Sequence, residues 1–146
     1  VRRSRFLHSL FNKIGICHFK SNLNVLALAD QEDLTNEFII GGIIDKFFIQ
    51  FELGWKVLKE LLSYEGQGIS ASGSPKMILK TAFTIYDFID ENVWLEMLRA
   101  RNDMTHIYDA LAARRLVDAV LQRYIPEFQK MKEGIESFYK DEIDNM

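Results

Sequence analysis

The chain has 146 residues, of which 48% are hydrophobic and 27% are charged. That length is most simply one domain, and the composition is that of an ordinary soluble globular protein. The longest apolar run, FIIGGII at 38–44, stops at Asp45 and is far shorter than the roughly 18 residues that a membrane span needs. Two prolines and eight glycines in the whole chain favour helices. We therefore expect a single all-α domain over residues 1–146, located in the cytoplasm.

The net charge of −3 conceals an asymmetry between the start of the chain and the rest. Residues 1–20 carry five basic residues and no acidic one, which gives +5, whereas the remainder holds 13 basic and 21 acidic residues, which gives −8. A basic start could bind nucleic acid or a lipid surface. We favour a solvated helix start, because Phe6, Leu10 and Ile14 recur along it like a packing face. The single Cys17 excludes an internal disulfide and a cysteine metal cluster.

The first two predicted helices follow from hydrophobic periodicity. The first spans about residues 5–29 and is weak near Gly15. The second is the clearest, because its apolar residues recur at three- and four-residue steps, at Phe47, Phe51, Trp55, Leu58 and Leu62. Thr35 or Asn36 can cap its start, and Gly66 can end it.

Ser74-Pro75 is a typical start of a third helix, whose stripe consists of Ile78, Ala82, Ile85 and Ile89. Asp90 can cap a short fourth helix, and a last helix runs from about residue 109 to 135 or beyond. Pro126 falls inside that last helix, so we expect a kink there. The predicted architecture is an antiparallel up-and-down bundle of four to five helices, with stripes wide enough for a dimer.

The fourth helix ends in residues that break its own apolar pattern. Trp94, Met97 and Leu98 form a core face, yet the next seam position is Arg101. An unpaired buried charge is very costly, so Arg101 must meet a carboxylate or face a cleft that binds an anion. Glu52, on the second helix, is the obvious internal partner.

Arg101 and Tyr108 share a face of an unbroken helix, whereas His106 lies on another side. A helix break near Thr105 or His106 would bring all three together. Two interpretations stay open on spacing alone. One is a structural Arg101–Glu52 pair with His106 as a core histidine. In the other, Arg101 binds phosphate through paired hydrogen bonds, His106 moves a proton and Tyr108 offers a hydroxyl.

Several enzyme classes are excluded by what the sequence lacks. It contains no GxGxxG, P-loop or HExxH motif. A minimal nucleotidyltransferase needs closely spaced aspartates after a Gly-Ser turn, but Gly73-Ser74 leads into PKMILK. The chain is therefore not itself that enzyme. Its three histidines form no ligand-spaced cluster, so we expect no metal site of its own.

Three motifs occur in a specific order: FE-x-x-WK at 51–56, SP followed by AF at 74–83, and RN-x-x-x-H-x-Y at 101–108. This combination resembles the nucleotidyltransferase substrate-binding protein family, which belongs to the HEPN superfamily of small helical proteins. The similarity covers about residues 45–135, and the predicted N-terminal helix at 5–29 diverges. Ile85-Tyr86-Asp87-Phe88 stands where the family more often has a glycine-leucine-isoleucine step.

The resemblance implies a helical bundle, often dimeric, that forms a complex with a separately encoded minimal nucleotidyltransferase in a toxin–antitoxin-type pair. The chain would hold no cofactor itself, and ATP would enter through the partner enzyme. Our candidate binding or modification residues are Arg101, Asn102, His106 and Tyr108, together with Glu52 as the partner of Arg101 and Lys56 as a surface charge that could meet a nucleotide phosphate. Our first hypothesis is accordingly a non-catalytic partner subunit, which the acidic body of the chain favours over an RNA-binding protein.

The resemblance also allows an alternative function, a metal-independent ribonuclease toxin acting on RNA. In it Arg101 and His106 from two subunits form one catalytic cleft, and the nucleotidyltransferase silences the toxin by transferring AMP to Tyr108. His106 would serve as the general acid or base, while Arg101 would stabilise charge on the phosphate. A third hypothesis is a structural dimer without activity, in which Arg101 is buried against Glu52 with no cleft.

Overall fold

A computed structural model describes residues 14–67 and 73–141 of the chain. The first part of the predicted N-terminal helix therefore lies outside the described residues. The elements in chain order are α2 (Ile14–Leu26), a 3-10 turn (Ala29–Gln31), α3 (Glu37–Tyr64), α4 (Pro75–Ile85), α5 (Glu91–Asn102), a 3-10 turn (Met104–Ile107), α6 (Ala110–Ala119), a π-helical turn (Val120–Tyr124) and α7 (Ile125–Phe138). The described part of the chain contains no strand.

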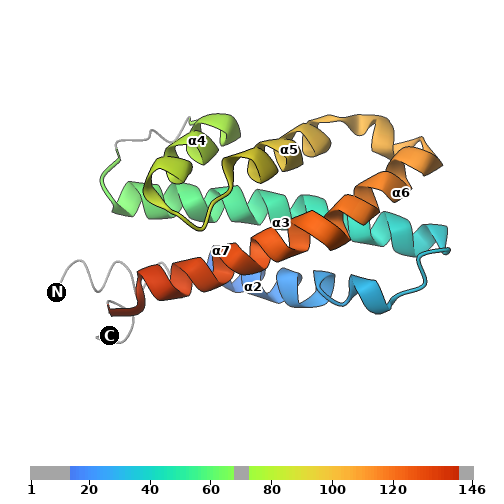
Figure 1. Ribbon diagram of the computed structural model, residues 1–146, viewed down its shortest axis with the longest axis horizontal. Coiled ribbons are helices and arrows are strands. Elements are labelled where there is room, and N and C mark those ends of the chain that lie inside the picture. Colours follow the sequence, from blue (N-terminus) through green and yellow to red (C-terminus); the bar gives the residue numbers. More distant parts are fainter. Residues whose placement is uncertain (1–13, 68–72, 142–146) are drawn as a thin grey trace.

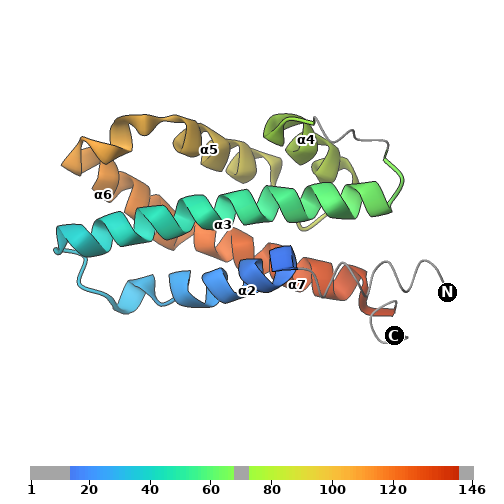
Figure 2. The same cartoon turned by 180° about the vertical axis from the view of Figure 1, so that it is seen from behind.

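The long helix α3 is the centre of the bundle and contacts α2, α4, α5 and α6. Figures 1 and 2 show α2 and α5 running opposite to α3, while α6 and α7 run in the same direction as α3. Because the π turn joins α6 to α7 without a loop, the described residues form five helices. The predicted antiparallel bundle of four to five helices is confirmed.

Polar side chains begin the helices where the sequence predicts. Asn36 caps α3 by accepting hydrogen bonds from the backbone N–H groups of Phe38 and Ile39. Ser74 caps α4 in front of Pro75, and Asp90 caps α5. At its other end α3 stops before Gly66, whose φ of +73° suits a residue without a Cβ atom.

One prediction about helix extent is wrong. Helix α4 ends at Ile85 because Tyr86 is extended, with φ −107° and ψ 118°, so Ile89 does not extend the stripe of α4. The predicted kink near Pro126 takes the form of a π-helical turn immediately before α7. Pro126 lacks a backbone N–H, and the wider turn before it changes the register of the helix at that point.

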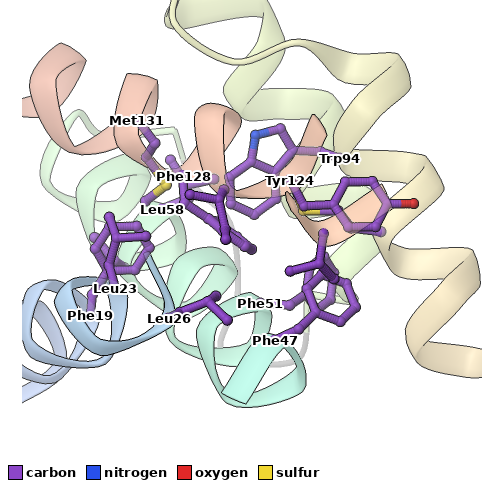
Figure 3. Close-up of a cluster of buried hydrophobic side chains, with 14 of the residues drawn as sticks. Phe19, Leu23, Leu26, Phe47, Phe51, Leu58, Trp94, Tyr124, Phe128 and Met131 are labelled. Atoms are coloured by element: carbon purple, nitrogen blue, oxygen red, sulfur yellow. The ribbon is translucent and has the colours of Figure 1, made fainter. Parts of the chain in front are cut away.

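Aromatic rings from four helices fill the core (Figure 3). Phe47 of α3 stacks on Tyr124 with ring centroids 5.1 Å apart, and Trp94 of α5 meets the edge of Phe128 at 5.5 Å. Phe19 of α2 packs against Phe128 as well. Such pairs add about 0.5–1.5 kcal/mol each beyond the area they bury, so they join α2, α3, α5 and α7 into one core.

A buried amide fixes α2 against α3. Gln50 is fully buried, and its Nε2 donates to the backbone oxygen of Phe19 at 3.1 Å. Its Oε1 accepts from Asn22 Nδ2 at 2.8 Å, and Asn22 also donates to the backbone oxygen of Lys46 at 3.0 Å. A buried amide with both ends paired is tolerated in one register only, so it specifies how α2 lies along α3.

A second set of buried polar side chains joins Tyr86, Tyr139 and Glu65. The hydroxyl oxygens of Tyr86 and Tyr139 lie 2.6 Å apart, and Tyr139 donates to Glu65 Oε1 at 2.9 Å. Tyr86 must therefore donate to Tyr139. Burial raises the pKa of Tyr86 to about 12 and also raises the pKa of Tyr139, so both stay neutral. These hydrogen bonds connect the ends of α3, α4 and α7.

We expect Tyr139→Phe to lower the free energy of unfolding by about 1–3 kcal/mol, because it removes both hydrogen bonds of the buried chain. Tyr86→Phe removes one bond and should cost about 1 kcal/mol. Urea unfolding followed by circular dichroism measures both. Tyr108→Phe, at an exposed position, is the control and should stay within about 0.5 kcal/mol of the wild type. Equal stability of Tyr139→Phe and the control would contradict this account.

Candidate functional site

Arg101, in the last turn of α5, forms the ion pair that the sequence predicts. Its Nη2 lies 2.7 Å from Oε1 of Glu52 in the middle of α3. The Arg101 and Glu52 side chains are 35% and 30% exposed, so the pair lies at the surface instead of being sealed in the core. This half-exposed position differs from the fully buried pair that the third hypothesis requires.

Two of the three sequence motifs meet in this pair. Trp55 Nε1 donates to Glu52 Oε2 at 3.0 Å, so each carboxylate oxygen of Glu52 has its own partner. Arg101 Nη1 donates to Asn102 Oδ1 at 3.1 Å, and Lys56 Nζ lies 5.8 Å from the centre of the Trp55 ring. The result is a linked set, Trp55–Glu52–Arg101–Asn102, which we call the Arg101 cluster. It fixes the guanidinium and leaves it further N–H donors for an anion.

Helix α5 is held in place at its start and its middle as well as at Arg101. Glu127 of α7 is buried and accepts a hydrogen bond from the backbone N–H of Asp90 at 2.9 Å. Burial raises the pKa of Glu127. In the middle, Trp94 packs on Gly54 so closely that a Cβ atom there would lie 2.8 Å from Trp94 Cη2. This close approach of α5 to α3 brings Arg101 within reach of Glu52.

The helix is interrupted between Asn102 and Ala110, a region that includes Thr105 and His106. Asp103 ends α5, and its side chain accepts from Thr105 N at 3.0 Å to start the 3-10 turn. Asp109 caps α6 by accepting from Leu111 N at 3.0 Å and from Ala112 N. These two acids therefore act as caps of the short loop between α5 and α6.

Tyr108 lies on a different part of this surface from the Arg101 cluster. Its side chain is 89% exposed. It lines a groove of about 420 Å³ between the starts of α3 and α6, together with Glu37, Ile40, Gly41, Ile44, Asp45, Asp109, Ala110, Ala113 and Arg114. Ile44 and Glu52 are two turns apart on α3, about 12 Å. The structure thus brings Arg101, Asn102 and Glu52 together, with Lys56 over the neighbouring Trp55 ring. Tyr108 lies instead at the groove beside the start of α3, so the structure does not bring it to Arg101.

The backbone of His106 lies in the 3-10 turn between Arg101 and Tyr108. Its side chain lies outside the described residues. The contact of His106 with either residue therefore stays a prediction.

Sequence reasoning missed a second charged group beside the site. Glu96 Oε2 accepts from the Tyr124 hydroxyl at 2.8 Å and lies 2.7 Å from Nη2 of Arg123. Burial, followed by the Glu96 carboxylate, raises the pKa of Tyr124. The sequence does contain a signal for charged groups in this region, because every arginine of the described residues falls between 99 and 123. These are Arg99, Arg101, Arg114, Arg115 and Arg123.

Within residues 14–67 and 73–141, no three His, Cys, Asp or Glu side chains gather as a metal ion would require. None of the helices described there is long and apolar enough to cross a membrane.

We expect Gly54→Ala to destabilise the fold by about 1–3 kcal/mol, because the added Cβ overlaps the rigid, fully buried Trp94. Alanine is otherwise the better helix residue, so a loss of stability isolates the contact. Gly15→Ala in α2 is the matched control, because a Cβ at Gly15 would meet nothing within 4 Å. Urea unfolding should show a loss for Gly54→Ala alone, and equal stability of the two variants would contradict the close approach.

Comparison with known proteins agrees with the motif pattern. Residues 17–137 match the family described as "Nucleotidyltransferase substrate binding protein like". The match begins earlier than residue 45 and so includes most of α2, which the motifs alone did not reach. A search of curated proteins found no match. The family match spans most of the length of the chain. The chain therefore belongs to the nucleotidyltransferase substrate-binding protein family.

Proposed function

We propose that this chain is the partner subunit of a separately encoded minimal nucleotidyltransferase, in a toxin–antitoxin-type pair, and that it presents Tyr108 as the acceptor of the nucleotidyl group. The family match supports the pairing with such an enzyme. The observation that carries the acceptor role is the exposure of Tyr108 at the mouth of the groove between α3 and α6. We expect two copies of the chain in the complex.

The loop that presents Tyr108 suits an acceptor because it is short and capped at both ends. Asp103 begins the 3-10 turn and Asp109 begins α6, so the backbone on either side of Tyr108 is hydrogen-bonded. A backbone held in this way restricts where the acceptor side chain can reach, which removes part of the entropy of positioning before the nucleotide binds. The partner enzyme would then need to bring only the nucleotide and its metal ions.

In the proposed transfer, the phenolic oxygen of Tyr108 attacks the α-phosphorus of ATP. A new P–O bond forms, the bond from the α-phosphorus to the oxygen bridging the β-phosphate breaks, and pyrophosphate leaves. The phenolic proton passes to a base at the site, for which His106 is our candidate. Arg101, held by Glu52 at 2.7 Å, would bind a phosphate of the incoming nucleotide, and Asn102 and Lys56 would border that phosphate.

The test uses the purified chain, its purified nucleotidyltransferase partner, magnesium and nucleoside triphosphates labelled at the α-phosphate. We expect label on the wild-type chain and none on Tyr108→Phe, because that variant lacks the accepting oxygen. Tyr64→Phe, at a half-buried tyrosine near the end of α3, is the control and should be labelled normally. Arg101→Ala should be labelled at least about 10-fold more slowly, since it loses a charge-assisted contact to phosphate. Full labelling of Tyr108→Phe would refute the acceptor role.

A ribonuclease is the second candidate function. The observation in its favour is that the arginines of the described residues all lie between positions 99 and 123. Four of them are exposed: Arg99, Arg114, Arg115 and Arg123. Guanidinium groups bind RNA phosphates, whereas a chain with an acidic body binds RNA poorly overall. In this reading Arg101 and His106 carry the catalysis.

Under our first proposal we expect the purified chain not to cleave RNA in excess chelator. The same assay is run on Arg101→Ala and His106→Ala, with circular dichroism to verify that each variant is folded. Cleavage by the wild type that disappears in both folded variants would make the chain a ribonuclease and would overturn the partner-subunit proposal.

A further inference from the structure

Glu127 of α7 is a buried carboxyl group that the proposed function leaves without a role. The residue is 7% exposed, and its Oε1 accepts the backbone N–H of Asp90 at 2.9 Å where α5 begins. Burial raises the pKa of Glu127. A raised pKa means that the ionised carboxylate costs free energy in the folded chain, so a neutral amide of the same shape would serve stability as well. Stability alone therefore does not account for an acid at this position.

Two charged side chains of the described residues act on the Glu127 carboxyl group. The carboxylate of Asp90 raises its pKa further, whereas Lys130, three residues along α7, lowers it. The hydrogen bond from the Asp90 N–H lowers the pKa as well, because it stabilises the ionised form. A donor that favours the ionised carboxylate is in turn held more tightly by it. The charge on Glu127 and its hold on the start of α5 are therefore coupled.

The indole of Trp94 connects Glu127 to α3. Its Nε1 is fully buried and makes no hydrogen bond of normal geometry within the described part of the chain, yet it lies close enough to Glu127 to lower the pKa of that carboxyl. Leaving a buried N–H without an acceptor is costly, and the Glu127 carboxylate is the acceptor at hand. On the other ring of the same indole, Cη2 would lie 2.8 Å from a Cβ atom at Gly54. Because the indole is rigid and packed among the core rings, its two ends cannot move independently (Figure 3).

Both helices that supply the Arg101–Glu52 pair are thus placed relative to one carboxylate. Glu127 contacts α5 directly at Asp90 and faces Trp94, which precedes Arg101 by seven residues, about 10 Å along the helix. The same indole rests on α3 at Gly54, two residues after Glu52. A small change in the position of α5 against α3 would alter the 2.7 Å contact between Arg101 Nη2 and Glu52 Oε1.

We propose that Glu127 is a positioning residue of the Arg101 cluster, whose ionised carboxylate holds the Asp90 N–H and the indole N–H of Trp94 and so sets how α5 lies on α3. The inference rests on the proposed function, in which Arg101 binds a phosphate of the nucleotide. Glu127 itself touches neither the nucleotide nor Tyr108. It acts through the placement of the guanidinium.

The charge on Glu127 then regulates the site. A protonated carboxyl group is a weaker acceptor for the two N–H donors, so α5 is held less firmly and Arg101 loses its alignment with Glu52. Because burial raises the pKa of Glu127, the proton is taken up at a higher pH than by an ordinary glutamate. The same proton stabilises the fold, since the folded chain binds it more tightly than the unfolded chain does. Acid therefore favours the fold at Glu127 while it loosens the site.

The first test follows the two indole N–H signals of the full chain in proton–nitrogen NMR spectra. Trp94 Nε1 faces Glu127, and Trp55 Nε1 donates to Glu52 at 3.0 Å within the Arg101 cluster. The chain has two tryptophans, so Trp55→Phe assigns both signals. As the pH falls, we expect both signals of the wild type to shift with one common midpoint. In Glu127→Gln, whose amide takes up no proton, that shared transition should disappear.

Tyr86→Phe is the matched control, because it removes a buried hydrogen bond at the other end of the turn between α4 and α5. It should lower stability and leave the shared transition in place. Histidine side chains and Glu52 titrate in these variants as in the wild type, so the transition that counts is the one lost in Glu127→Gln alone. A Trp55 signal that stays still while the Trp94 signal shifts would overturn the positioning role, as would the absence of any shift at Trp94. Should Glu127→Gln fail to fold, separate midpoints in the wild type overturn it by themselves.

The second test measures labelling of Tyr108 by the purified nucleotidyltransferase over a series of nucleotide concentrations. We expect Glu127→Gln to raise the KM for the nucleotide by about 3- to 10-fold with little change in kcat, because a misplaced Arg101 weakens binding of the phosphate. Tyr86→Phe should be labelled like the wild type. Normal labelling of Glu127→Gln at every nucleotide concentration would overturn the positioning role. An unlabelled wild type would instead refute the proposed function, and the NMR result is decided without the enzyme.

Discussion

The contact between Trp94 and Gly54 sets the distance between α5 and α3, and the Arg101 cluster depends on that distance. A side chain at residue 54 would push α5 outward, since its Cβ would lie 2.8 Å from the indole. Arg101 is seven residues, or two helical turns, beyond Trp94, so a displaced α5 would carry its guanidinium away from Glu52. Gly54 is a poor helix former within α3, yet its lack of a side chain is what allows the charged pair to form. Glu127 contributes by holding the first turn of the same helix.

The Arg101–Glu52 pair also decides how the site treats an anion. Half-exposed ion pairs contribute only about 0–1 kcal/mol to stability. The stability of the fold therefore depends little on the Arg101–Glu52 pair. Its value lies in orientation, because Trp55 fixes the carboxylate and the carboxylate fixes the guanidinium. An incoming phosphate must then bind the other nitrogens of Arg101, since Nη2 is paired with Glu52. Glu52 also repels a second negative charge, which limits how many phosphates the cluster can hold.

Much of the fold could be predicted from the sequence, because it depends on local chemistry. Asn36, Ser74 and Asp90 are capping residues whose effect is confined to one turn, and the stripe along α3 has a period that sequence alone reveals. The pairing of Arg101 with Glu52 was predictable for a different reason. A cation on an apolar seam needs a carboxylate, and few acids lie on the facing stripe.

The features that escaped prediction depend on contacts between distant residues. The hydrogen bond from Tyr86 to Tyr139 joins positions 53 residues apart, and Phe88 occupies the space over Gly134 where a side chain would collide with its ring. No periodicity marks either contact. The π turn before Pro126 was missed because proline signals an interruption without signalling its form.

The placement of Tyr108 away from the Arg101 cluster has a consequence for how the motif works. The loop between them is capped by Asp103 and Asp109, so its two ends cannot approach each other without breaking a cap, at a cost of about 1 kcal/mol for each. Within one copy, the guanidinium and the phenol are therefore held apart along α3. A nucleotide that reaches both must span that separation, with a phosphate at Arg101 and its reacting end near Tyr108.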